Sequence, residues 1–345
     1  MIPKRVYLAL FCWVIAGLSP MVPAEARSKP PLLAPKVVII TMFPPETKPW
    51  LEGETLTIKI PVAGMDTDFP DVSCNPQGLC AITTGMGFAN AASTVSALIY
   101  SRQFDLRRTY FIIDGIAGVD PKDGTLGSVH WARYATDATL RHEIDPRQMP
   151  ADWTTSFVAL GGAAPGHKPT HLAGTEIYRL NEALLQKAFT LTRDTPLVDS
   201  SDAQSYRKHY DGTVATGVPI VSICDTSSAD LYWHGSVMAE QVEAWTSLLS
   251  DGKSNYCTSQ MEDNATLTAL KRGADAGLLD FDHVALLRSA SNFDREGKGQ
   301  TAADSMTSNS GGFVIALTNG YRVGAGLAHA IVKDWGVWSR GVPAN

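Results

Sequence analysis

Short apolar runs alternate with helix-like patterns over most of the chain. The run "KVVIITM" at 36–42 is β-branched and apolar along most of its length, which is typical of a strand buried on both faces of a parallel sheet. Strands are expected at 36–42, 79–87, 109–118, 218–224 and 283–291, and helices at 88–102, at 236–249, within 258–272 and at about 321–335. This alternation predicts an α/β domain of three layers, αβα, around a mixed and mostly parallel sheet.

Residues 140–175 interrupt this alternation. The segment contains Pro146, Pro150, Pro165 and Pro169, and it holds four glycines. Such a composition favours turns over regular elements. We expect a long irregular insertion on the surface of the domain.

The first 26 residues have the layout of a secretory signal. Lys4 and Arg5 precede an apolar run that extends to Leu18, and the small-residue motif "AEA" ends at Ala26. We expect cleavage near Ala26, a single mature domain at 27–345, and a location in the periplasm or outside the cell. An uncleaved anchor is the alternative. After the leader, no window reaches 18 apolar residues without a charge, so no transmembrane span is expected in the mature chain.

The charge balance narrows the ligand class. The chain has 29 Lys and Arg against 35 Asp and Glu, a formal net charge of −6, and no run of basic residues. Nucleic-acid binding normally requires a basic patch. We therefore expect no nucleic-acid partner and a small-molecule ligand.

Four cysteines remain once Cys12 leaves with the leader: Cys74, Cys80, Cys224 and Cys257. An even number suits disulfides in an oxidising compartment, and four cysteines allow three pairings. The short loop "CNPQGLC" makes Cys74 with Cys80 the first choice, which leaves Cys224 with Cys257. Free buried thiols are the alternative.

Polar and glycine-rich segments follow several of the predicted strands, where an open α/β sheet places its ligands. The loop "FPPETKPW" after the first strand carries Glu46. After the second strand, Thr84, Gly85 and Gly87 open a helix, so a ligand oxygen could approach backbone N–H groups there. A tight structural turn explains the same glycines equally well.

Two aromatic residues lie in the loop "SSADLYWHG" after the fourth strand. Tyr232 and Trp233 could form a stacking wall for a flat base. Aromatic residues are more often part of a core, and that interpretation stays open for both.

The stretch "TSQMEDNATLTALKR" places two carboxylates at the start of an apolar helix. Glu262 and Asp263 could cap the helix, because acidic groups suit its amino end. One cap does not need both of them. The alternative is that Glu262, beside Met261, binds two hydroxyl groups of a ligand at the edge of the sheet.

Metal and cofactor motifs are weak. His167 and His171 have the i, i+4 spacing of a metal pair, but Pro169 between them disfavours a helix. The sequence also lacks a G-x-S-x-G elbow, an H-E-x-x-H motif, a phosphate-binding P-loop and a full dinucleotide fingerprint. We expect neither a metal nor a cofactor.

Five segments in order resemble a known superfamily: "KVVIITMFPPE", "TTGMGFANAA", "DGIAG" with "GTLGSVHWARYATDA", "SQMEDNA" and "LLRSASNFD". The chain resembles the nucleoside phosphorylases and nucleosidases, and most closely the purine nucleoside permease family. The resemblance implies a nucleoside phosphorylase-like fold and a purine nucleoside as ligand. It implies that Met261 and Glu262 hold the ribose, that Tyr232 stacks on the base, and that Glu46 activates water.

Two departures from the superfamily affect the expected chemistry. Phosphorylases hold phosphate with an arginine in the first loop, and this chain has none between residues 36 and 50. Asn292 stands where adenine-specific nucleosidases have an aspartate, as in relatives that prefer 6-oxopurines. Asp294 is the alternative residue for contact with the base.

The leading hypothesis is therefore an exported enzyme that hydrolyses the N-glycosidic bond of 6-oxopurine nucleosides for salvage. Glu46 would direct water, and Asn292 or Asp294 would stabilise the departing base. The rival hypothesis is a non-catalytic nucleoside-binding protein that assists uptake. A homodimer is kept open as the assembly.

Overall fold

The strand β1 (Val37–Thr41) lies inside the sheet, and its composition explains why. All five of its residues are buried, and successive side chains pack in apolar clusters on opposite faces. β-branched side chains fill such a two-sided position well. The computed structural model describes residues 32–344, and the leader predicted for the first 26 residues lies outside them.

Twelve strands form the central sheet of the described chain. β1 pairs in parallel with β4 and β5, and β14 pairs in parallel with β5 over most of its length. β13 runs antiparallel to β5, so the sheet is mixed, as predicted. The strands are β1, β2 (Ile58–Pro61), β3 (Asp71–Cys74), β4 (Leu79–Thr83), β5 (Tyr110–Val119), β6 (Val129–Trp131), β7 (Tyr134–Asp137), β10 (Ile177–Arg179), β11 (Val221–Ile223), β12 (Asp225–Ser228), β13 (Tyr256–Gln260) and β14 (Val284–Phe293).

The strand expected at 218–224 is the place where the chain changes neighbours. β11 pairs with β6, and after Cys224 the chain continues as β12, which lies between β7 and β13. The strand predicted at 218–224 is present as β11, whereas β12 was not predicted, because its polar sequence "DTSS" lacks the apolar or alternating pattern that indicates a strand.

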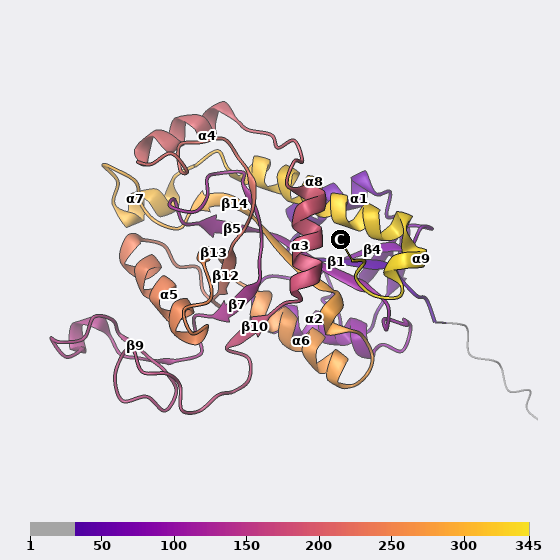
Figure 1. Ribbon diagram of the computed structural model, residues 1–345, viewed down its shortest axis with the longest axis horizontal. Coiled ribbons are helices and arrows are strands. Elements are labelled where there is room, and N and C mark those ends of the chain that lie inside the picture. Colours follow the sequence, from indigo (N-terminus) through magenta and orange to yellow (C-terminus); the bar gives the residue numbers. More distant parts are fainter. Residues whose placement is uncertain (1–31, 345) are drawn as a thin grey trace, which may run out of the picture. The chain divides into compact units, whose positions relative to one another are not determined.

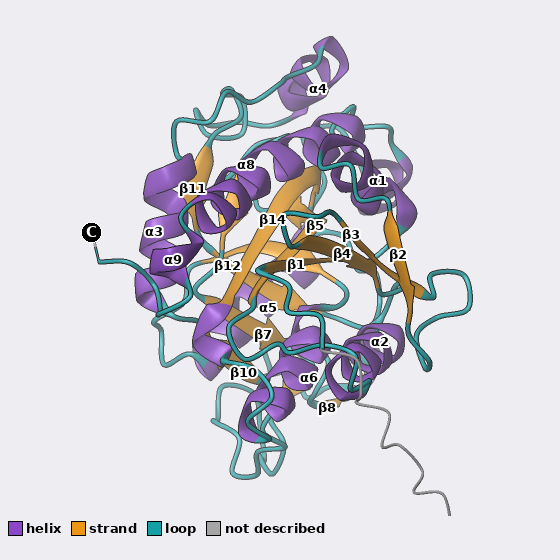
Figure 2. Cartoon of the chain, turned by 90° about the vertical axis from the view of Figure 1, so that its right-hand side faces the viewer, coloured by secondary structure: helices purple, strands orange, loops and turns teal. Residues whose placement is uncertain are grey.

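Helices cover both faces of the sheet, which confirms the three-layer prediction. Figure 2 shows α1 and α8 above the sheet and α2 and α6 below it. The two apolar clusters agree: residues of α2 and α6 share one with the sheet, and residues of α1, α3 and α8 share the other. The helices are α1 (Pro44–Gly53), α2 (Phe88–Tyr100), α3 (Glu182–Thr192), α4 (Ser201–Tyr206), α5 (Ser236–Leu249), α6 (Asp263–Asp275), α7 (Ala302–Thr307), α8 (Phe313–Lys333) and α9 (Trp335–Trp338).

Two helices differ from the expectation. The segment after β1, expected as a loop, is the helix α1, with Pro44 and Pro45 in its first turn. Proline fits there because the first N–H groups of a helix have no intrahelical partner. Glu46 therefore lies in a helical turn rather than in a loop. The last long helix begins at Phe313, earlier than the expected start at about 321.

The insertion at 140–175 is largely irregular, as predicted, and it extends from the lower left of the molecule in Figure 1. Its regular parts are η1 (Pro146–Gln148) and a two-stranded sheet of β8 (His142–Glu143) and β9 (Phe157–Val158). Phe157 packs edge-on against Trp245 of α5. This contact fixes the base of the insertion to the domain.

The structure contains the two disulfides that were the first choice. Cys74–Cys80 joins β3 to β4, and Cys224–Cys257 joins the residue between β11 and β12 to β13. Cys257 lies where β13 shifts its register against β12. Within residues 32–344, no helix combines the length and apolar character that crossing a bilayer requires.

Candidate functional site

A pocket of about 150 Å³ lies at the ends of β1, β5, β13 and β14. This is the edge of the sheet where α/β proteins place their ligands. Most of its walls are apolar, with a small number of polar groups, as in typical small-molecule sites. The lining residues are Met42, Phe43, Glu46, Met86, Ile116, Ala117, Gly118, Tyr232, Ser259, Gln260, Met261, Glu262, Arg288, Ser291 and Asn292.

Glu46 enters the pocket from the first turn of α1 and is 6% exposed. The backbone N–H of Met42 donates to its Oε2, and that of Ile116 donates to its Oε1, both at 2.8 Å. Burial raises the pKa of Glu46 to about 8, although Arg288 and the two N–H groups favour the charged form. Burial thus disfavours the charged form of this side chain, while the two N–H donors hold both of its oxygens in one position.

Glu262 does not cap α6, because Gln260 does so. The Gln260 side-chain oxygen accepts from the backbone N–H groups of Glu262 at 2.8 Å and of Asp263 at 2.9 Å. Glu262 makes no capping bond with its own side chain and lines the pocket, where the N–H of Gly87 donates to it at 3.2 Å. The capping interpretation of this pair is wrong, since the amide two residues earlier already satisfies the helix end.

Asp263 has a different partner. Its carboxylate receives the guanidinium of Arg288 through Nε at 3.1 Å and through Nη2, a two-point ion pair that is fully buried. The same guanidinium lies 3.6 Å from Glu262 and donates to the carbonyl of Ile116 at 3.1 Å. Burial raises the pKa of Glu262 and of Asp263, and Arg288 opposes both shifts.

The sequence interpretation did not single out Arg288. It stands in the middle of the buried run of β14, within the letters "VALLRSAS", and is 1% exposed. An arginine is almost never fully buried unless it is paired. An arginine within a buried apolar run therefore indicates that acidic partners lie beside this strand.

Tyr232 and Trp233 separate into the two roles that were open for them. Tyr232 lines the pocket, is 54% exposed, and accepts a hydrogen bond on its hydroxyl from the Asn292 amide at 3.2 Å. Trp233 is 9% exposed and packs in an apolar cluster with Phe157 and Trp245. The suggestion that Trp233 also forms a stacking wall is wrong, because its ring is part of that apolar cluster and not of the pocket lining.

Asn292 and Asp294 also lie in different surroundings. Asn292 lines the pocket; its amide oxygen accepts from the Ser291 hydroxyl at 2.9 Å, and its NH₂ group donates to the Phe293 carbonyl at 2.9 Å. Asp294 is buried outside the pocket and binds Arg295 at 2.7 Å and the Tyr256 hydroxyl at 2.8 Å. The alternative assignment of base contact to Asp294 is therefore wrong: its partners hold it away from the cavity.

The glycine turn before α2 contributes Met86 to the pocket wall, whereas Thr84, Gly85 and Gly87 lie outside the lining. Gly85 and Gly87 have φ values of +80° and +87°, so the turn needs glycine for its backbone conformation. The Thr84 hydroxyl donates to the Gly85 carbonyl at 2.7 Å, and Met86 alone of this turn lines the pocket. The structural interpretation of these glycines is supported.

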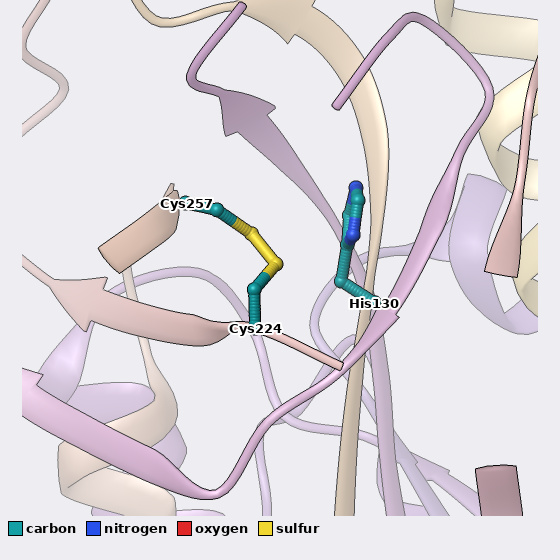
Figure 3. Close-up of side chains that lie close together, drawn as sticks. All are labelled: His130, Cys224 and Cys257. Carbon is teal, nitrogen blue, oxygen red and sulfur yellow. A yellow bond between two sulfur atoms is a disulfide. The ribbon is translucent and has the colours of Figure 1, made fainter. Parts of the chain in front are cut away.

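Figure 3 shows His130 beside the Cys224–Cys257 disulfide. A ring nitrogen and the two sulfurs lie within 4.8 Å of one another, and all three residues are buried. Metal binding uses thiolates, and these sulfurs are bonded to each other. Burial lowers the pKa of His130 to about 4, so the ring is neutral, and its Nδ1 lies 2.8 Å from the Ser222 hydroxyl.

The sheet order, the layers and the position of the pocket define a nucleoside phosphorylase-like α/β protein. The chain superimposes on futalosine hydrolase of Helicobacter pylori with a TM-score of 0.53 and 14% identity, covering 86% of this chain and 98% of that one. It matches a 5'-methylthioadenosine/S-adenosylhomocysteine nucleosidase from Neisseria meningitidis with a TM-score of 0.50 and 17% identity, covering 87% and 100%. These likenesses establish the fold.

Within that class, the chain belongs to the purine nucleoside permease (NUP) family, whose model matches residues 34–343. It is 38% identical over 351 residues to a probable purine nucleoside permease of Schizosaccharomyces pombe, covering 96% of this chain and 99% of that protein. It is 34% identical over 307 residues to a purine nucleoside permease of Candida albicans, covering 87% and 76%. The family expected from the sequence is confirmed.

Proposed function

We propose that this protein binds purine nucleosides in the pocket and thereby assists their uptake. The names of its relatives in Schizosaccharomyces pombe and Candida albicans support nucleoside transport as the general role. The observation that carries the proposal is the position of Glu262: Gln260 caps the helix, and the Glu262 carboxylate faces the cavity. A buried carboxylate that neither caps a helix nor forms a full ion pair can accept hydrogen bonds from the two hydroxyl groups of a ribose.

The remaining contacts follow from the pocket walls. Met261 packs beside the sugar, and Tyr232 offers a half-exposed aromatic face to the purine. Asn292 lies next to the Tyr232 hydroxyl, so its amide reaches the edge of a base stacked on that ring. An amide both donates and accepts, which suits the N7 and O6 edge of a 6-oxopurine.

Hydrolysis of the N-glycosidic bond is the second candidate, and Glu46 favours it. A buried carboxylate in the pocket with a pKa of about 8 could act as a general base above that pH. Below it, the protonated form would donate a hydrogen bond to a ligand oxygen instead.

Phosphorolysis is disfavoured by the same geometry. Among the described residues, Arg288 is the one basic side chain that lines the pocket, and Asp263 and the Ile116 carbonyl occupy it. A phosphate ion would find no free guanidinium there.

Incubation with inosine, guanosine and adenosine in phosphate-free buffer tests the proposal. Calorimetry should show binding, and chromatography should recover the intact nucleoside near pH 7. Free base and ribose, with a rate that rises towards pH 8 and then levels off, would establish hydrolysis instead. Absence of binding by all three nucleosides would refute both functions.

Export is the accompanying proposal on location. Two disulfides suit an oxidising compartment, and the leader motif suits cleavage near Ala26. Mass spectrometry of the native protein should find a start near Arg27 and a mass about four hydrogens below the reduced form, because two disulfides remove two hydrogens each. A full-length reduced chain would contradict export.

A further inference from the structure

The amino end of α2 adjoins the pocket, and carboxylates of the chain itself occupy it. The N–H of Gly87 donates to Glu262 at 3.2 Å, and the N–H of Phe88 donates to Asp230 at 2.9 Å. Met86, in the same turn, lines the pocket. Backbone N–H groups at such a position readily hold phosphate groups. Here Glu262 and Asp230 have taken two of them.

The pocket also carries more acid than base. Glu46 and Glu262 line it, and the guanidinium of Arg288 is held by Asp263. Asp230 adds an exposed carboxylate at the rim, next to the turn that carries Met86. A phosphate ester entering this space would meet the negative charge of Asp230 and would find no free cation among the described residues of the pocket lining. An uncharged nucleoside does not carry this cost.

We infer that Asp230 is a specificity-determining residue that makes the pocket reject phosphorylated nucleosides while it admits uncharged ones. The inference rests on the proposed nucleoside-binding function and names its ligand class more closely. Two effects act together: the carboxylate repels phosphate, and it occupies the Phe88 N–H that would otherwise receive a phosphate oxygen. Because Asp230 is exposed, salt screens the repulsion.

Asp230 can be changed without removing a wall of the pocket. In Asp230→Asn the amide oxygen still accepts from the Phe88 N–H, while the charge is lost. Asp304→Asn is the matched control. Its carboxylate accepts from Thr301 at the amino end of α7, so the variant loses the same charge at another helix end that lies outside the pocket lining.

The probes are 9-deazainosine, whose carbon–carbon glycosidic bond cannot be hydrolysed, and its 5'-phosphate. Dissociation constants are measured by calorimetry at low salt for the full mature chain. We expect the wild type to prefer the nucleoside by about 100-fold, and Asp230→Asn to bind the phosphate about tenfold more tightly with nucleoside affinity changed less than about threefold. Asp304→Asn should match the wild type, and high salt should shrink the difference.

An unchanged preference in Asp230→Asn, or an equal change in Asp304→Asn, would overturn the inference while leaving nucleoside binding intact. Failure of 9-deazainosine to bind the wild type would overturn the proposed function and this inference with it. Retained nucleoside affinity in each variant shows that the variant is folded, so a null result cannot be attributed to misfolding.

Discussion

Two buried arginines, Arg288 in the middle of β14 and Arg295 just after its end, differ in how they pair with the surrounding acids. Arg295 binds Asp294 and Asp120, and the Tyr256 hydroxyl donates to Asp294, so most of the acceptors in this group have a donor within the protein. None of these four residues lines the pocket. The carboxylates of this group therefore have their hydrogen-bond partners within the protein.

Arg288 lies among more acids than it can pair. Its guanidinium binds Asp263 at two points, and the Glu262 carboxylate lies 3.6 Å from it. The Glu46 carboxyl group accepts hydrogen bonds from backbone N–H groups only. Burial raises the pKa of Glu46 and of Glu262. A paired cluster stabilises a protein, whereas a cluster with surplus carboxylates retains hydrogen-bonding capacity for a ligand. The contrast between the two arginine clusters can be tested by variants in each.

The largest effect is expected from Glu46 and the pH dependence of stability. Its folded pKa of about 8 exceeds the ordinary 4.5, so folding takes up a proton. The stabilisation is complete below pH 4.5 and is lost as pH rises through 8, on the order of 5 kcal/mol over that interval. Glu46→Gln should lose this pH dependence in urea unfolding measured at pH 5, 7 and 9.

Glu52→Gln is the control for that measurement, since Glu52 lies exposed on the same helix. Burial also raises the pKa of Asp114, to about 6. Both variants should therefore keep a smaller decrease in the free energy of unfolding at lower pH. If Glu46→Gln and the wild type lose equal stability between pH 5 and 9, the carboxyl is ionised throughout.

The cluster of Arg295, Asp294, Asp120 and Tyr256 should respond mainly in stability. Asp294→Asn leaves Arg295 with an incomplete set of partners in a buried position. We expect the free energy of unfolding to fall by about 3–5 kcal/mol, with nucleoside affinity of the native protein nearly unchanged. Urea titration and calorimetry measure the two quantities. A variant of normal stability that had lost affinity would place Asp294 at the ligand after all.

The cluster around Arg288, with Asp263, Glu262 and Glu46, should respond mainly in nucleoside binding. Glu262→Gln keeps an acceptor for the Gly87 N–H but replaces one carboxylate oxygen by NH₂, so one sugar hydroxyl loses its acceptor. Nucleoside affinity should fall by about ten- to a hundredfold, equivalent to about 1–3 kcal/mol. Calorimetry with ribonucleosides and 2'-deoxynucleosides checks this. An equal loss for both series would show that Glu262 does not read the 2'-hydroxyl.

The smallest effect is a shift of preference rather than a loss. Asn292→Asp removes the NH₂ donor, now bound to Tyr232 and Phe293, that the proposed function assigns to O6 of a 6-oxopurine, so inosine should lose about tenfold relative to adenosine. The ratio of the two dissociation constants, in wild type and variant, is the measurement. An unaltered ratio would mean that Asn292 serves only its bonds to Ser291, Phe293 and Tyr232.

The sequence predicted correctly those features that depend on a local pattern of residue types. The run at 36–42 had to be a doubly buried strand, and Glu262 and Asn292 could be placed at the ends of strands before any geometry was known. Roles that depend on a partner distant in sequence were out of reach. The role of Arg288 depends on its ion pair with Asp263, and that of Asp294 on its hydrogen bond with Tyr256. Each pair is separated by more than twenty residues in sequence. Capping of α6 by Gln260 depends on a side-chain direction that no pattern of polar positions reveals.

The position of Cys257 sets which side chains of β13 reach the pocket. Tyr256 pairs with Asp225 and Thr258 pairs with Thr226, so Cys257 is the extra residue of a β-bulge, and the disulfide holds it there. Side chains alternate along a strand, so deleting one residue at this point would turn Ser259 and Gln260 to the opposite face and displace the start of α6. The bulge thus shifts the alternation of side chains in β13 by one residue, and the position of the Glu262 carboxylate in the pocket depends on it.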